Sequence, residues 1–332
     1  MKNKKIILKN LLTVKRSQSK PDERPLTDLE KELEAAIRAD SLLKEKEYKT
    51  VIKEFKKYFK EEARLPILYW QITTAYNSIN DFYQSIDLLH DAEDNFPSIH
   101  EFWYLLGDAY AGIGSPSLAV SYYKKAIDKE TSSNQQLIEF YSDRMAEQKR
   151  LIKSRDYFKY SVLQTKIPPP NTLERELENV IYIKSLLHNK EYNKVIRNVH
   201  KYNDVSDYLP ILIWYQSIAY IETGKLRSAE ITLDYAMMMF PEFHEYYYLL
   251  GDCYAAKKKP EASNENYRKG LIYENISNRK LISYYEKKVR KQERLFKDII
   301  KTRSCPPMSV HTAESPRSLG IPSWVKTYLT TL

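Results

Sequence analysis

The stretch "HEFWYLLGDAYAGIG", residues 100–114, returns almost unchanged 144 residues later as "HEYYYLLGDCYAAKK", residues 244–258. The same offset relates "SLLKEKEYKTVI" at residues 41–52 to "SLLHNKEYNKVI" at residues 185–196. Matches of this length, at one constant spacing, indicate an internal duplication. We therefore interpret the chain as two copies of one module.

Within each copy, large and small side chains recur in a shorter, 34-residue frame. Counted from His100, bulky residues fall at positions 4, 7, 11 and 24, and small residues at positions 8, 15, 20 and 27. The spacing predicts pairs of antiparallel helices, in which small residues allow close approach and bulky ones pack against the next pair. The residues that carry this structural signature are Trp103, Leu106, Gly107, Tyr110, Ala119, Tyr247, Leu250, Gly251 and Tyr254.

This pattern resembles the tetratricopeptide repeat. The resemblance implies an all-α fold, an α-solenoid of helix-turn-helix repeats, duplicated as two three-repeat modules. Each module ends in a charged helix without the repeat signature, which we interpret as a capping helix because a solenoid needs a terminal element with one polar face. The predicted repeats span about 32–65, 66–99 and 100–133 in the first module and about 176–209, 210–243 and 244–277 in the second.

The changes in composition along the chain predict four regions. A short, stiff "KIPPP" segment at residues 166–170 separates the two modules. The predicted regions are a basic N-terminal tail (1–24), a first module (25–168), a second module (169–303) and a Pro/Ser-rich C-terminal tail (304–332).

The composition argues against most enzyme folds. Only 7 glycines occur in 332 residues, whereas phosphate-binding folds use glycine at their turns. The two cysteines, Cys253 and Cys305, are too few for a disulfide framework or a four-ligand zinc site. His100-Glu101 begins like a zinc-protease motif but lacks the second histidine. We predict no catalytic, cofactor-binding or metal-ligating residue, and no enzymatic activity.

The sequence contains no run of 18 apolar residues, so we predict no membrane span. An intracellular protein, cytoplasmic or nuclear, is the expectation from its few cysteines. The N-terminus "MKNKKIILKNLLTVKRSQSK" is basic and lacks acidic residues, which leaves a mitochondrial presequence as an alternative to a solvated tail.

The resemblance also implies a concave groove lined by the first helix of each repeat. Aromatic anchors ringed by carboxylates suit a helix or an extended peptide. Trp70 and Trp214 are interpreted either as contact anchors for a partner or as packing between repeats. The predicted partner-binding residues are Trp70, Thr74, Asn77, Glu101, Tyr104, Asp108, Trp214, Ile218, Glu245, Tyr248 and Asp252.

The predicted function is that of a non-catalytic adaptor or scaffold that binds other proteins or peptides, within a larger assembly. More narrowly, "DSLLKEKEYKTVIKEF" at residues 40–55 and "GSPSLAVSYYKKAI" at residues 114–127 resemble the N-terminal repeats of subunit seven of the anaphase-promoting complex, a homodimerising scaffold. Apolar faces at Leu33 and Leu177 favour homodimerisation in the same way. The alternative is a nucleic-acid-associated repeat protein, because residues 279–303 carry ten basic and three acidic side chains.

Overall fold

The computed structural model describes residues 24–60, 64–130, 134–154, 168–202 and 210–304. Within these ranges every regular element is a helix, which confirms the all-α prediction. Both predicted tails lie outside the described residues, apart from Arg24 at one end and Ser304 at the other.

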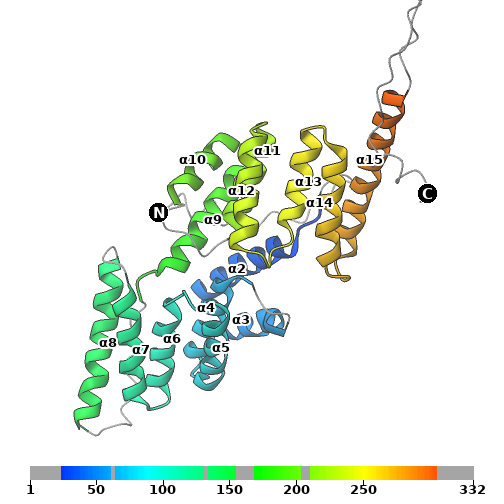
Figure 1. Cartoon of the computed structure of the whole chain (residues 1–332). Helices are drawn as coiled ribbons and strands as arrows, with labels where there is room; N and C mark the ends of the chain where they lie inside the picture. The colour runs from blue at the N-terminus through cyan, green and yellow to red at the C-terminus, as the bar shows by residue number, and fades with distance from the viewer. Residues whose placement is uncertain (1–23, 61–63, 131–133, 155–167, 203–209, 305–332) are drawn as a thin grey trace, which may run out of the picture. The chain divides into compact units, whose positions relative to one another are not determined.

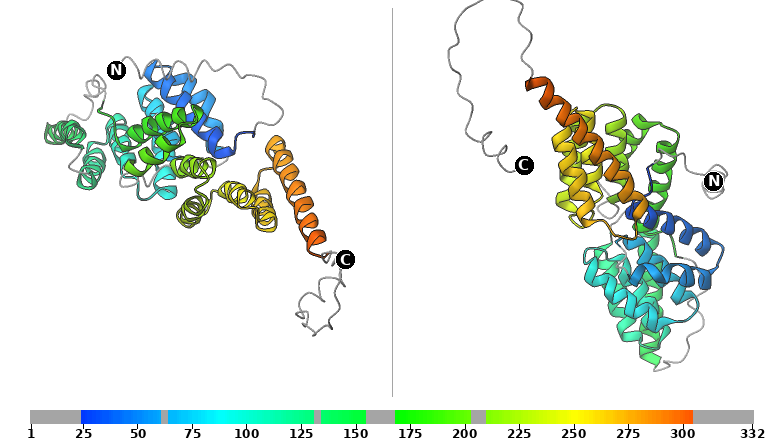
Figure 2. Two further views of the ribbon diagram at one scale, coloured as in Figure 1. Left: turned by 90° about the horizontal axis from the view of Figure 1, so that it is seen from above. Right: turned by 90° about the vertical axis from the view of Figure 1, so that its right-hand side faces the viewer.

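Consecutive helices contact one another from α2 to α8 and from α9 to α14, and α6, α7 and α8 lie side by side (Figures 1 and 2). The first half contains α2 (Asp28–Lys44), α3 (Tyr48–Phe55), the 3-10 helix η1 (Lys56–Lys60), α4 (Pro66–Ser78), α5 (Phe82–Asn95), α6 (Glu101–Gly112), α7 (Pro116–Lys129) and α8 (Gln135–Ser154). The second half contains α9 (Thr172–His188), α10 (Tyr192–Tyr202), α11 (Pro210–Glu222), α12 (Leu226–Met239), α13 (Tyr246–Ala256), α14 (Pro260–Tyr273) and α15 (Arg279–Ser304).

The described residues up to Glu293 belong to one compact unit, and the end of α15, from Arg294, belongs to a second. The two halves of the duplication, as far as Glu293, therefore lie in the first unit. The boundary between the two modules stays a prediction.

The backbone of the turns between paired helices shows the same 34-residue period. A residue in the left-handed region recurs every 34 residues in each half, which allows the chain to reverse within a few residues. Glycine occupies two of these positions, and lysine or asparagine the others. The residues are Lys46, Asn80 and Gly114 in the first half and Lys190, Gly224 and Lys258 in the second.

Gly107 and Gly251 show why the repeat requires a small residue at its eighth position. A Cβ atom on Gly107 would lie 2.4 Å from the ring of Tyr123, and one on Gly251 would lie 2.4 Å from the ring of Tyr267. Each tyrosine comes from the second helix of the same repeat. The ring therefore fills the space that a side chain would take, and the two helices of the repeat pack closely.

The other signature residues divide between the core and its edge. Trp103 is half-buried, and its indole Nε1 donates a hydrogen bond to Glu93 Oε1 at 2.6 Å. Tyr110 is also half-buried and stacks on Tyr122, with 5.2 Å between ring centroids. The buried members are Leu106, Gly107, Ala119, Leu250 and Gly251, and the remaining half-buried ones are Tyr247 and Tyr254.

The predicted capping helices pack on the last repeat of each half through stacked tyrosines. Tyr141 of α8 stacks on Tyr104 at 4.0 Å between ring centroids. Tyr285 of α15 stacks on Tyr248 at 3.8 Å. These four rings are buried, so each capping helix covers apolar surface that the last repeat would otherwise expose.

Candidate functional site

The inner helices of the two halves, α4 and α6 in the first and α11 and α13 in the second, carry the predicted partner-binding residues, with Glu245 at the N-cap of α13. Trp70 and Trp214 are both buried. Their surroundings include the first helix of the opposite half: α4 contacts α9, and α11 contacts α2. The inner surface of each half therefore already holds a helix, and that helix belongs to the same chain.

Trp214 contacts the N-terminus of α2. Its indole Nε1 donates a hydrogen bond to Glu30 Oε1 at 3.2 Å. The guanidinium of Arg24 lies 5.3 Å from the centre of the Trp214 ring and donates to both carboxylate oxygens of Glu30, at 2.7 and 2.8 Å. Burial alone would raise the pKa of Glu30, but Arg24, Thr27 and Trp214 together hold it below its usual range.

Glu245 on the second half binds the same helix terminus. Its carboxylate accepts the backbone N–H of Leu29 at 3.1 Å, one of the amides that a helix leaves without an internal partner. Arg64 donates to both oxygens of Glu245, at 2.9 and 3.1 Å, and its Nε donates to Glu32 at 3.0 Å. Burial would lower the pKa of Arg64, but the two carboxylates raise it above its ordinary value, so the guanidinium remains charged.

The first half makes the corresponding contact, in which α9 is the bound helix. Burial raises the pKa of Glu174, while hydrogen bonds from the Asn171 backbone and the Trp70 side chain act in the other direction. Burial likewise raises the pKa of Glu101, against the charge of His100 and the hydroxyl of Thr172. The pair Glu174 with Trp70 repeats, 144 residues along, the pair Glu30 with Trp214. Glu101 differs from Glu245, because among the described residues its buried carboxylate oxygens accept no hydrogen bond like that from the Leu29 amide.

Both bound helices begin with the same local motif, a capping box. In α2 the Thr27 side chain accepts the N–H of Glu30 at 3.3 Å, and Glu30 accepts the N–H of Thr27 at 2.9 Å. In α9 the corresponding distances for Asn171 and Glu174 are 2.9 and 3.0 Å. The glutamate at the third helical position thus closes the cap and also meets a tryptophan of the opposite half.

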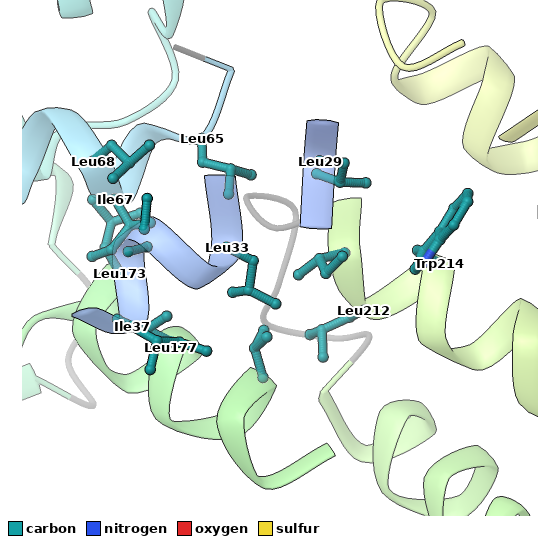
Figure 3. Packing of buried hydrophobic residues seen from close by; sticks show 14 of the residues in the cluster. Leu29, Leu33, Ile37, Leu65, Ile67, Leu68, Leu173, Leu177, Leu212 and Trp214 are labelled. Atoms are coloured by element: carbon teal, nitrogen blue, oxygen red, sulfur yellow. The ribbon is translucent and has the colours of Figure 1, made fainter. Parts of the chain in front are cut away.

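The apolar side of α2 completes the contact. Leu29, Leu33 and Ile37 lie in one continuous core with Leu65 and Ile67 of the first half (Figure 3). The same core includes Leu173, Leu177, Leu212 and Trp214 of the second half. The expectation that the faces at Leu33 and Leu177 are free for a second copy of the chain is therefore wrong, because both leucines are buried within this one.

Farther along the inner surface, the predicted residues hold the capping helices. Tyr248 donates to Glu274 at 2.8 Å and Tyr104 donates to Glu130 at 3.3 Å. Asp252 accepts from the Tyr267 hydroxyl at 2.5 Å and from Lys288 of α15 at 2.5 Å.

Asp108 has the corresponding contacts in the first half, accepting from the Tyr123 hydroxyl at 2.6 Å and pairing with Arg144 of α8. These inner carboxylates are thus partnered within the chain.

Three of the predicted residues make simpler contacts. The Thr74 hydroxyl donates to the backbone carbonyl of Trp70 at 2.7 Å, and Asn77 Nδ2 donates to the carbonyl of Leu105 at 3.2 Å. Ile218 is half-buried and packs against the core. Contact between the predicted partner-binding residues and a separate protein stays a prediction.

The sequence analysis missed several residues that hold the bound helices, chiefly Arg24, Glu30, Arg64 and Glu174. The capping-box patterns at residues 27–30 and 171–174 were the available signal, because they mark helix starts followed by apolar residues at every fourth position. That signal locates the helices without indicating what they pack against.

The described part of the chain has no group of three or more His, Cys, Asp or Glu side chains placed to hold a metal ion. Nor does any helix in it have the length and apolar character needed to cross a bilayer.

The geometry defines a class of protein, a helical repeat array with inner helices that pack against other helices of the same chain. Family models described as "Tetratricopeptide repeat" match residues 76–134 and residues 244–276. These two segments are therefore tetratricopeptide repeats, as the sequence pattern predicts. A search of curated proteins gives no match.

Solved structures of other repeat proteins are similar at low identity. They include YrrB, a protein with an unusual peptide-binding site (14% identity, 70% of this chain and 98% of that one, TM-score 0.31). Others are yeast Sti1 TPR2AB in complex with pHSP90 (13%, 80% and 98%, 0.33) and the Cut9–Hcn1 hetero-tetramer of the APC/C (11%, 78% and 48%, 0.33). At these scores the similarities carry no information about what this chain binds.

Proposed function

We propose that the chain is a non-catalytic protein-interaction scaffold with inner surfaces that bind α-helices. One observation supports this most directly: each half packs against the first helix of the other, and in both contacts a tryptophan meets the capping-box glutamate of that helix. A surface that accepts one helix by burying apolar side chains and pairing its terminal amides has the chemistry to accept another of the same kind.

The contacts specify the kind of helix that fits. It begins with a capping box, carries glutamate at the third position beside a tryptophan, and presents a free amide to a buried carboxylate. Leucine or isoleucine follows at every fourth residue, as at Leu29, Leu33 and Ile37. A partner helix with these features would compete with α2 or α9, which have the advantage of being tethered. We further propose that the chain is part of a larger assembly in the cytoplasm or the nucleus.

Affinity purification from the source cells, followed by reconstitution with the purified partner, tests the proposal. A synthetic peptide of residues 24–44 should compete with the reconstituted partner. The same peptide with Glu30→Ala and Leu33→Asp serves as the matched control and should not compete. The proposal fails if no protein partner can be reconstituted, or if both peptides have equal effects.

The nucleic-acid alternative receives less support from the ion pairs of the basic region. Lys288 pairs with Asp252 at 2.5 Å, and Arg290 lies 3.8 Å from Glu286. Part of the positive charge is thus neutralised within the chain. Retention on an RNA column that falls steeply with salt would restore this alternative.

A further inference from the structure

Helix α12 exposes a stripe of large apolar side chains. Ile231, Tyr235, Met238 and Met239 are 54, 47, 70 and 45% exposed. Their spacing places them on one side of the helix. The opposite side carries the buried residues Ala229, Leu233 and Ala236, which pack α12 into its own half. The four exposed residues, called the α12 stripe below, contribute little to the core.

The first half provides an internal control for this surface. Helix α5 occupies the equivalent place, and 144 residues before the α12 stripe it carries Asp87, Asp91, Asp94 and Asn95, all exposed. The buried side of α5 keeps the same pattern, with Leu89 and Ala92. The fold is therefore formed equally well with carboxylates on this surface, and folding does not require the apolar residues of α12. Contiguous exposed apolar residues that folding does not require are typical of an interaction site.

Opposite charges flank the two ends of the stripe. Arg227 lies four residues before Ile231 on α12, and Glu242 lies in the turn that follows the last helical residue, Met239. Arg227 is 80% exposed and reaches Glu230 only at 3.3 Å, while Glu230 already accepts closer bonds from Lys257 at 2.5 Å and Tyr254 at 2.8 Å. Glu242 is exposed and has no ion pair among the described residues.

This arrangement is complementary to a reversed copy of itself. When two α12 helices pack antiparallel about a two-fold axis, Ile231 of each faces Met238 of the other, and the end that carries Arg227 lies against the end that Glu242 of the other copy follows. Parallel packing would instead bring like charges together. We propose that the chain self-associates through the α12 stripe, with a second copy of itself as the occupant. A two-fold, self-complementary contact of this kind closes at two subunits.

The first half cannot make the same contact. Residues 83, 87 and 94 of α5 are tyrosine, aspartate and aspartate where α12 has Arg227, Ile231 and Met238. Two such faces would oppose carboxylate to carboxylate, and like charges directly opposed are unfavourable. The duplication thus leaves this contact to α12 and not to α5, and a two-fold contact through α12 alone gives a dimer and not a filament.

Sedimentation velocity of the full-length chain between about 1 and 100 μM tests the proposal. The wild-type protein should shift from monomer to dimer mass, and the double variant Ile231→Asp, Met238→Asp should remain a monomer. Leu118→Asp is the matched control, because Leu118 is also an exposed apolar residue but lies on α7 of the first half. This control should dimerise like the wild type, and circular dichroism should show all variants to be folded.

A charge exchange tests the antiparallel arrangement. Arg227→Glu alone should weaken dimerisation about 2- to 30-fold, as expected for the loss of two exposed ion pairs, one on each side of the axis. The double variant Arg227→Glu, Glu242→Arg should recover the wild-type dissociation constant. A wild-type protein that remains monomeric over the whole range, or a double Asp variant that still dimerises, would overturn the proposal. Failure of the charge exchange to restore dimerisation would overturn the antiparallel pairing.

Discussion

The two halves of the chain share their buried contacts and differ in the charges around them. In the second half, Glu245 holds the Leu29 amide and is paired with Arg64. In the first half, Glu101 has no arginine within ion-pair distance among the described residues, and His100 lies 3.6 Å away. The outer surfaces differ further, with aspartates on α5 and apolar residues on α12. The two copies thus keep the same kinds of buried side chain, because these hold the helices together. Their ion pairs and exposed side chains differ.

The largest difference between the halves is expected at the paired glutamates. Glu245→Ala should lower the free energy of unfolding by about 3–5 kcal/mol, because it leaves Arg64 partly buried with only Glu32. Glu101→Ala should cost about 1 kcal/mol or less, because burial already disfavours its charge and removing it leaves no arginine unpaired. Urea unfolding of both variants measures the contrast. Equal losses would mean that Arg64 does not distinguish the two sites.

A smaller effect is expected at Glu30 and Glu174, where the pKa shifts have opposite signs. The pKa of Glu30 is held below 4.5, so the stability that its charge contributes is present above that pH and is lost as the pH falls through its folded-state pKa. The pKa of Glu174 is raised above 4.5, so its contribution is present below that pH and is lost as the pH rises through its folded-state pKa. The physical cause is Arg24, since the equivalent position 168 is proline.

Glutamine variants measure this contrast. Glu30→Gln should cost about 1.5–3 kcal/mol at pH 7, the range for a hydrogen bond to a charged group, and less at pH 3. Glu174→Gln should cost less at pH 7 than at pH 4. Unfolding free energies between pH 3 and 8 provide the test. Parallel pH profiles for the two variants would contradict the assigned role of Arg24.

The smallest effect should be the same in both halves. Gly107→Ala and Gly251→Ala each place a Cβ atom against a tyrosine ring 2.4 Å away, in matching geometry. Overpacking costs about 1–3 kcal/mol, and the better helix propensity of alanine offsets about 1 kcal/mol, so a net loss of about 1 kcal/mol is expected at each site. Thermal unfolding of the two variants measures this loss of stability. A loss in only one half would show that the two repeats pack differently around these tyrosines.

Much of the fold could be predicted because it depends on the local spacing of large and small side chains. The 34-residue frame predicted the hairpins, and Gly107 and Gly251 predicted the close helix pairs. The left-handed lysines Lys46, Lys190 and Lys258 could not be predicted from residue type, because the turn geometry prevails over the ordinary avoidance of positive φ.

The binding of each first helix by the opposite half could not be read from the sequence. Trp70, Trp214, Glu101 and Glu245 indicated the kind of ligand, an apolar helix with a polar terminus, but not where it comes from. That depends on how two distant segments meet. One sign was present in α2, where Leu33, Ala35, Ala36 and Ile37 place apolar residues around most of its circumference. A helix buried on nearly all sides needs more than its own hairpin to cover it.

The reciprocal docking of α2 and α9 has a consequence for synthesis on the ribosome. The amide of Leu29 and the carboxylate of Glu245 that binds it are separated by 216 residues. The nascent α2 can pack against α3 and α4 early, but the part of its binding surface that α9, α11 and Glu245 supply exists only after most of the chain has emerged. Closing so long a loop is slow, so the last step of maturation joins the earliest helix made to one of the latest.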